Sequence, residues 1–208
     1  MTVRSALEAL FLFSAVVFVV APGAGPGPTP LVLKVTPIAS LAALVLLQRG
    51  AGWVPVLAAL VFSATGDLSL ELGAFVPGLG AFLLAHLCYI AAFAARPRFS
   101  AGGVLLALGL LAFAAGLGRL LLPETGTLAP AVLAYLAVIT AMALVAAFCG
   151  AGRWAVAGAV AFVLSDALIA VNRFLEPVPG ARHAIMLLYY AAQFGLTARA
   201  RGWPAGPG

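Results

Sequence analysis

Eight apolar runs, each long enough to cross a lipid bilayer as a helix, follow one another with breaks of only a few residues. A bilayer core takes about 20 apolar helical residues. The runs fall roughly at 5–22, 31–48, 53–71, 76–95, 102–121, 128–149, 153–173 and 181–200. Pro/Gly clusters mark several breaks, such as APGAGPGPTP after the first run. We therefore predict an all-α polytopic membrane protein with eight transmembrane helices in one domain, residues 1–208.

Composition agrees with this prediction and argues against other classes. Only 8% of the residues are charged, whereas about 25% is usual in a water-soluble domain. The net charge of +5 comes from basic residues scattered singly rather than in a cluster, so we expect no nucleic-acid binding. Cys88 and Cys149 lie inside apolar runs and are expected to be packing residues.

The basic residues are unequally divided between the two sides of this arrangement. Seven arginines fall on one side: Arg4, Arg49, Arg96, Arg98, Arg153, Arg199 and Arg201. The opposite side carries Lys34, Arg119, Arg173 and Arg182, together with Glu71, Glu124 and Glu176. The positive-inside rule places both termini in the cytoplasm, and we expect a multi-pass protein of a bacterial inner membrane.

The two halves of the chain resemble each other weakly. GDLSL (66–70) is followed by YIAAF (89–93), and SDALI (165–169) is followed at a similar distance by YAAQF (190–194). Lys34 lies about one repeat length before Tyr135. A parallel four-plus-four duplication fits this pattern.

The segment FSATGDLSLEL (62–72) puts a carboxylate, Asp67, near the end of the third run, and Asp166 lies at hydrocarbon depth in the seventh. An ionisable group at that depth is costly unless it is paired or faces water, so it is functional by default. At 1.5 Å per residue, most other polar residues of the runs fall in the same half of the bilayer. These residues are Lys34, His86, Tyr135, Tyr189, Tyr190 and Gln193. Tyr89 shares a helix face with His86, and Ser165 and Asn172 form a stripe next to Asp166. We expect them to converge on one interior site.

Several of these residues have a structural alternative. Lys34 can snorkel to the interface. His86 can be a hydrogen-bonding residue of the interior. The others can serve to hold helices together: Tyr89, Tyr135, Ser165, Asn172, Tyr189 and Gln193. Three further acidic residues and the second histidine are expected to be solvated in loops or at the interface: Glu71, Glu124, Glu176 and His183.

Other kinds of site are poorly supported. There is no G-x-S-x-G nucleophile motif, and no glycine-rich phosphate loop follows a strand. Two histidines without a cysteine cluster make a zinc site poor. We therefore expect no metal site.

The motifs LKVTP, FSATGDLSL, GLGAFLLAHLCYIAAF, AFVLSDALIAVNRF and LLYYAAQF occur in this order along the chain. On these motifs the chain resembles the lysoplasmalogenase family, the YhhN-type integral membrane hydrolases. The resemblance covers most of the chain, although the first and fifth runs contribute little. The residue after Lys34 is Val35 rather than the proline common in the family, whereas Pro37 is retained. The resemblance implies hydrolysis of the vinyl ether bond of lysoplasmalogens to a fatty aldehyde and glycerophosphoethanolamine or glycerophosphocholine.

The implied reaction agrees with the polar residues. A vinyl ether is cleaved by protonation of its β-carbon, which yields an oxocarbenium ion that water attacks. Glycosidases form and stabilise a related oxocarbenium-like species with two carboxyl groups, one protonated and one ionised. We expect Asp67 and Asp166 to be this pair, although the sequence does not decide which is the acid. His86 is expected to orient the water.

The remaining candidates are expected to bind the substrate, with Lys34 suited to the lipid phosphate. They are Lys34, Tyr89, Tyr135, Ser165, Asn172, Tyr189, Tyr190 and Gln193. The expected partners are a lysophospholipid substrate and the bilayer, a homo-oligomer is left open, and the chemistry requires no metal or organic cofactor. Two alternatives remain: a proton-coupled transporter, which intramembrane carboxylates and a repeat would also suit, and a zinc-dependent, ceramidase-like hydrolase.

Overall fold

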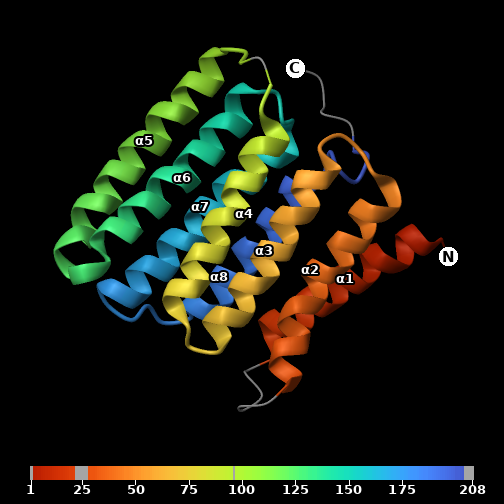
Figure 1. Cartoon of the computed structure of the whole chain (residues 1–208), viewed down its shortest axis with the longest axis horizontal. Coiled ribbons are helices and arrows are strands. Elements are labelled where there is room, and N and C mark those ends of the chain that lie inside the picture. Colours follow the sequence, from red (N-terminus) through yellow and green to blue (C-terminus); the bar gives the residue numbers. More distant parts are fainter. Residues whose placement is uncertain (1, 22–27, 96, 204–208) are drawn as a thin grey trace.

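The computed structural model describes residues 2–21, 28–95 and 97–203, and this part of the chain forms eight α-helices (Figure 1). The helices are α1 (Val3–Val20), α2 (Pro28–Gln48), α3 (Trp53–Glu71), α4 (Phe75–Phe93), α5 (Ala101–Leu121), α6 (Ala129–Phe148), α7 (Arg153–Phe174) and α8 (Ala181–Leu196). Two short 3-10 turns, Leu122–Glu124 and Gly126–Leu128, join α5 to α6, and no strand occurs among the described residues. The predicted all-α fold is confirmed, and the boundaries of the first seven helices agree within a few residues. The predicted end of the first run, residue 22, and Arg96 lie outside the described residues.

Helices α1 to α7 are each long and apolar enough to cross a bilayer, by length and composition. α8 is shorter, with 16 residues, and ends at Leu196 rather than at residue 200 as predicted. The chain leaves the α-helical path because the Ala198 N–H donates to Gly195 O, only three residues back. Arg201 folds over the helix end and donates to Phe194 O. α8 packs on α1, α2 and α7, so neighbouring helices rather than lipid surround much of it.

Consecutive helices run in opposite directions, with α1 and α2 at one edge of the bundle and α5 and α6 at the other (Figure 1). Within each half, every helix packs on the next one in the chain. The halves meet through contacts of α4 with α6 and of α8 with α1 and α2. The α4–α6 and α8–α2 contacts would be equivalent if α5–α8 repeated α1–α4. The four-plus-four duplication nevertheless stays a prediction.

Large apolar side chains lie on the outside of the bundle as well as inside it. Phe13 and Leu105 are each 70% exposed, and Leu187 is 63% exposed. Such a surface suits a hydrocarbon environment and would be unfavourable in water. Cys88, within α4, and Cys149, directly after α6, are free and half-buried.

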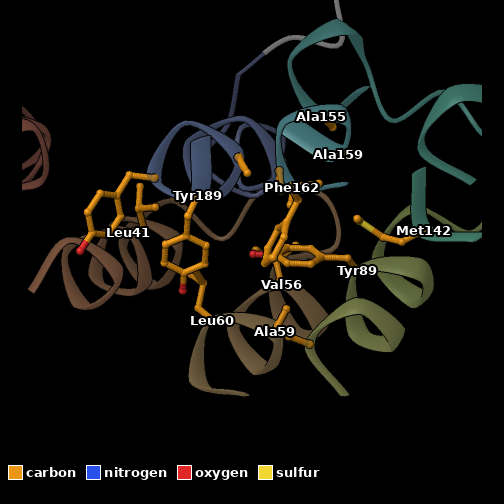
Figure 2. Close-up of a cluster of buried hydrophobic side chains, with 14 of the residues drawn as sticks. Leu41, Val56, Ala59, Leu60, Tyr89, Met142, Ala155, Ala159, Phe162 and Tyr189 are labelled. Atoms are coloured by element: carbon orange, nitrogen blue, oxygen red, sulfur yellow. The ribbon is translucent and has the colours of Figure 1, made fainter. Parts of the chain in front are cut away.

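Two glycines allow α7 and α8 to approach closely. A Cβ atom on Gly195 would lie 2.4 Å from Trp154 O and 2.9 Å from Gly158 Cα. Small residues at a helix contact let two backbones pack at short range. One turn along α7 from Gly158, the ring of Phe162 packs edge to face on Tyr189 of α8, with centroids 5.5 Å apart (Figure 2). This contact fixes where α8 presents Tyr189 to the interior.

Candidate active site

A cavity of about 270 Å³ lies mainly between α2, α3, α7 and α8, near the end of the bundle where α3 ends and α8 begins. Asp67 of α3 and Asp166 of α7 both line it, as do Lys34 of α2 and Tyr189 of α8. The rest of its wall is largely apolar: Phe18, Leu70, Phe82, Ile169, Ile185 and Met186. Two carboxyl groups from separate helices therefore line the same cavity, as the sequence predicts.

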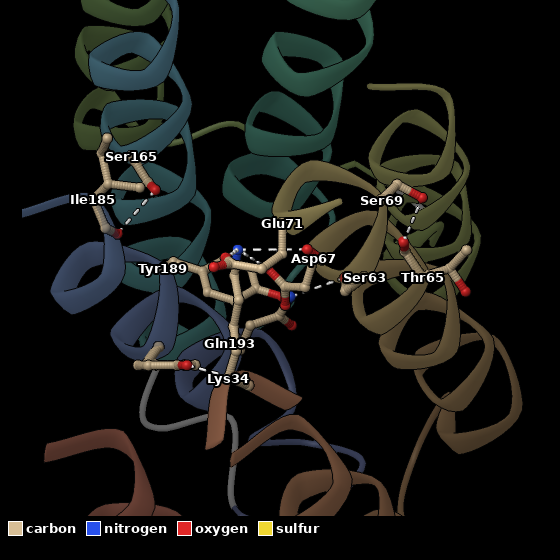
Figure 3. A network of polar contacts seen from close by, with 11 residues as sticks. Lys34, Ser63, Thr65, Asp67, Ser69, Glu71, Ser165, Ile185, Tyr189 and Gln193 are labelled. Atoms are coloured by element: carbon tan, nitrogen blue, oxygen red, sulfur yellow. Dashed lines mark hydrogen bonds and ion pairs between the residues drawn. The ribbon is translucent and has the colours of Figure 1, made fainter. Parts of the chain in front are cut away.

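Asp67 is nearly fully buried, and its partners are one cation and one phenol (Figure 3). Lys34 Nζ lies 3.9 Å from Asp67 Oδ1 and 3.4 Å from the backbone oxygen of the same residue. The same ammonium lies 3.1 Å from Glu71 Oε2. The Tyr189 hydroxyl donates to Asp67 Oδ2 at 2.6 Å. The carboxyl group of Asp67 therefore has a positive charge and a hydrogen-bond donor as its neighbours.

Asp166 has different neighbours. The Tyr135 hydroxyl donates to its Oδ2, and His86 Nε2 lies 4.0 Å from the same oxygen. His86 is fully buried, with the rings of Tyr135 and Phe162 at centroid distances of 5.3 and 4.6 Å. Neither ring nitrogen of His86 has a hydrogen-bond partner among the described residues. Within the described part of the chain, no lysine or arginine forms an ion pair with Asp166.

The two halves of the bundle hold the two aspartates in parallel ways. Each aspartate contacts a residue on the helix before its own, Lys34 for Asp67 and Tyr135 for Asp166. These are the two residues that the internal similarity aligns. Each aspartate also contacts the last helix of the other half, through Tyr189 of α8 or His86 of α4. The site therefore depends on the contact between the halves.

Lys34 and Glu71 differ from part of the sequence interpretation. The snorkelling alternative for Lys34 is wrong, because this residue is only 7% exposed and its ammonium lies among carboxylates. Glu71 is exposed, as expected, but it also pairs with Lys34 and lines the cavity. The physical reason is the spacing, since residues four apart share one helix face and both Asp67 and Glu71 can reach one ammonium.

Four of the predicted substrate-binding residues do not line this cavity. One is Tyr135, which lines only the small pockets beside Asp166. The others are Tyr89, Tyr190 and Gln193. Tyr89 donates to Gln193 Oε1 at 2.5 Å, and Gln193 Nε2 donates to Ser63 Oγ at 2.9 Å. All three side chains are fully buried, and they tie α3, α4 and α8 together. The Tyr190 hydroxyl donates to the backbone oxygen of Lys34 at 2.9 Å and so holds α8 against α2.

Ser165 and Asn172 line the cavity, but their polar groups are already engaged. Ser165 donates to Ile185 O at 3.1 Å, and Asn172 Oδ1 accepts from the Val178 N–H at 2.9 Å. The first contact joins α7 to α8, and the second orders the connection between them. Both residues therefore help to fix the shape of the cavity, because each holds part of the backbone of α8 or of the α7–α8 connection in place.

Two arginines of the site were missed as site residues. Arg182 lines the main cavity, with its guanidinium carbon 5.0 Å from the centre of the Phe18 ring. Arg173 lines an adjoining cavity of about 260 Å³ and lies 4.0 Å from the centre of the Phe75 ring. Neither forms an ion pair with a carboxylate of the described residues. The available signal was their position on the same side of the membrane as Lys34.

Two small apolar pockets adjoin the cavity at Asp166. One, of about 60 Å³, lies between α3, α4, α6 and α7 and includes Leu79, Phe82 and Val132 in its wall. The other, of about 40 Å³, lies between α5, α6 and α7. Asp166 and Tyr135 line both pockets, whereas Asp67 lines only the main cavity. An apolar chain lying in these pockets would pass beside Asp166.

The arrangement is suited to proton transfer. It combines a carboxyl group beside an ammonium, a second carboxyl group among aromatic rings, and two tyrosine hydroxyls that donate to them. In the part of the chain that the structure describes, no three His, Cys, Asp or Glu side chains are grouped as ligands of a metal ion.

Comparison with known proteins places the chain in a family. The lysoplasmalogenase TMEM86A of Bos taurus is 36% identical over 193 residues, which cover 83% of this chain and 78% of the relative. The human lysoplasmalogenase TMEM86B is 40% identical over 141 residues, 67% of this chain and 60% of its own. A lysoplasmalogenase of Mycobacterium tuberculosis (strain CDC 1551 / Oshkosh) is 37% identical over 150 residues, 67% and 58% of the two chains. No solved structure matches. The model of the YhhN family matches residues 29–200, and the chain is a member of this family.

Proposed function

We propose that this protein is a lysoplasmalogenase of the membrane. It hydrolyses the vinyl ether bond of a 1-alkenyl glycerophospholipid and releases a fatty aldehyde and the glycerophospho-headgroup. Relatives that bear this name match most of the chain. The structural observation that carries the proposal is that Asp67 and Asp166 line one cavity at the interior of an apolar bundle.

The reaction needs both carboxyl groups in different protonation states. One aspartic acid gives its proton to the β-carbon of the vinyl ether, and the resulting oxocarbenium ion is stabilised by the nearby negative charge of the other. The ionised aspartate then accepts a proton from the water that attacks the cation. A largely apolar wall favours this arrangement, because it strengthens electrostatic interactions within the site and favours a neutral carboxylic acid where no cation is near. General acid–base catalysis of this kind typically contributes about 10²- to 10⁴-fold to the rate.

The charges around the cavity suggest how the lipid lies. We propose that Arg182 binds the phosphate, because it lines the cavity and forms no ion pair within the described residues. Lys34, which the sequence suggested for this role, already contacts two carboxylates. The alkenyl chain then extends past Phe82 into the apolar pockets beside Asp166. This placement puts the ether bond between head and tail, next to the two aspartates.

The charge distribution also supports an orientation. Arg4, Arg49, Arg153 and Arg199 lie at or near helix ends on the side opposite the cavity. We propose that this side faces the cytoplasm, with both termini, and that the cavity lies in the outer half of a bacterial inner membrane.

The test is aldehyde release by the purified protein from a lysoplasmalogen and from the saturated ether analogue. We expect hydrolysis of the first only, because the analogue has no double bond to protonate. Asp67→Asn and Asp166→Asn should each lower kcat by at least 100-fold, in line with the usual contribution of acid–base catalysis. Glu124→Gln, at an exposed acid on the same side of the bundle, is the matched control. Near-normal rates in both Asp variants would refute the assignment.

A further inference from the structure

We propose that the two aspartates have fixed and different roles: Asp166 is the acid that protonates the β-carbon, and Asp67 is the base that activates water. Lys34 is the positioning residue that keeps Asp67 ionised. This inference rests on the proposed function and goes beyond it, since lysoplasmalogenase activity alone does not require this division of roles. Two independent observations carry it.

The first observation is the difference in charge around the two carboxyl groups. Asp67 faces the ammonium of Lys34 from α2, the Glu71 carboxylate from its own helix and the Tyr189 hydroxyl from α8. From α4 it is approached by the ring of Phe82, which packs on Gly66 and carries no charge. The cation at 3.9 Å favours the ionised form of Asp67.

Asp166 has no comparable cation. Its nearest basic group is His86, whose ring is fully buried among the rings of Tyr135 and Phe162 and has no hydrogen-bond partner within the described residues. An imidazolium there would be a buried charge without solvation, so His86 is neutral. A carboxyl group in such apolar surroundings without a cationic partner favours the protonated form. Asp166 is therefore the proton donor.

The second observation is where each carboxyl group lies along the path of the lipid. In a vinyl ether the carbon that accepts the proton is one atom nearer the tail than the carbon that water attacks. Asp166 lines both the main cavity and the apolar pockets that suit the tail. Asp67 lines only the main cavity, where Lys34, Glu71 and Arg182 also lie. The acid is thus placed toward the tail and the base toward the head.

The proton balance closes over one turnover. Asp166 transfers its proton to the β-carbon and becomes a carboxylate, while the double bond becomes an oxocarbenium ion. Water adds to that ion and loses a proton to Asp67, which gives a hemiacetal. When the hemiacetal collapses, its hydroxyl proton goes to Asp166 and the departing glycerol oxygen takes a proton from Asp67. The products are the aldehyde and the glycerophospho-alcohol, and both aspartates return to their starting states.

Azide distinguishes the two roles. It is a nucleophile that adds to an oxocarbenium ion without help from a base, so it can replace activated water. It cannot protonate the vinyl ether, so it cannot replace the acid. We would treat purified Asp67→Ala and Asp166→Ala with a lysoplasmalogen in sodium azide and measure the aldehyde and the azido ether by mass spectrometry. The azido ether is the substrate plus one hydrogen azide. Asp67→Ala should release at least 100-fold less aldehyde than the wild type in the absence of azide and form the azido ether in its presence. Asp166→Ala should form neither product.

Each result bears on the proposal. An azido ether from Asp166→Ala alone would reverse the roles, and the adduct from both variants or from neither would refute their separation. The Asp→Asn pair, checked for helical content and thermal unfolding in detergent, guards against a misfolded Ala variant. Aldehyde release by the wild type tests the proposed function separately: an inactive wild type refutes that function, whereas an active wild type with the wrong adduct pattern refutes only the division of roles.

Discussion

Replacing Lys34 by Met removes the ammonium that lies 3.9 Å from Asp67 Oδ1 and 3.1 Å from Glu71 Oε2. Two unit charges about 4 Å apart attract each other by about 4 kcal/mol at an effective permittivity of 20. Glu71 shares the ammonium, and its side chain is 34% exposed, so water screens part of this attraction. We therefore assign about half, ~2 kcal/mol, to the preference for ionised Asp67. At 1.36 kcal/mol per pH unit this corresponds to about 1.5 pH units.

The sign follows from the role of Asp67 as a base. Without Lys34 the ionised form of Asp67 is less favoured, so a higher pH is needed to populate it. The acid-side limb of the kcat profile of Lys34→Met should therefore move up by about 1.5 pH units, with a roughly 30-fold lower kcat below that limb. KM should change little. The assay is aldehyde release from a lysoplasmalogen in detergent micelles over a series of buffers.

Two variants control this experiment. Lys34→Arg retains a positive charge and should return the limb toward its wild-type position. Arg4→Met removes a cation from a partly exposed ion pair with Glu8 on the other side of the bundle and should leave the profile unchanged. A limb that stays in place, or moves to lower pH, would refute the reasoning. A rise in KM with an unchanged kcat profile would instead favour phosphate binding by Lys34.

Three further predictions follow from the geometry. Arg182→Gln should raise KM for a lysoplasmalogen about 10-fold or more, because a hydrogen bond to a charged group is lost. Hydrolysis of an alkenylglycerol, which has no phosphate, should not change. Equal effects on both substrates would contradict phosphate binding. Gly195→Ala should lower the free energy of unfolding by about 1–3 kcal/mol in detergent, because the new Cβ would overlap the backbone of α7. Gly102→Ala is the control, since no atom lies within 4 Å of the Cβ that it adds. Gln193→Leu leaves the Tyr89 hydroxyl without its acceptor and should cost about 1–3 kcal/mol of stability, with little change in KM; a large KM increase would put Gln193 in the substrate site.

The parts of the fold that could be predicted are those that depend on local composition. A run of about 20 apolar residues bounded by Pro and Gly is a helix across a bilayer in almost any tertiary context. The third run, 53–71, has the same bounds as α3 for this reason. α8 was predicted too long, because no Pro or Gly follows Leu196 directly to mark its end. The turn at Ala198 and the packing of Arg201 on Phe194 end the helix there.

The site was predictable only in part. Asp67 and Asp166 could be chosen because a carboxyl group at membrane depth is costly without a partner. Tyr189 and Gln193 share one face of α8, four residues apart, yet Tyr189 reaches the cavity and Gln193 bonds to Ser63 away from it. The side of the membrane separated Arg182 from the arginines at the opposite ends of the runs, but not from Arg119.

The sequence by itself determined a polytopic helical membrane protein with two carboxyl groups at similar hydrocarbon depth, because hydropathy and spacing along one helix are local properties. Only the tertiary structure decided which side chains meet: Lys34 with Asp67, and Tyr135 with Asp166. The physical reason is that lipid and protein interior are both apolar, so the hydrophobic pattern of a helix does not reveal which face it turns inward. The rotation of each helix is set by contacts such as that of Gly195 on Gly158, and these involve residues distant in the chain.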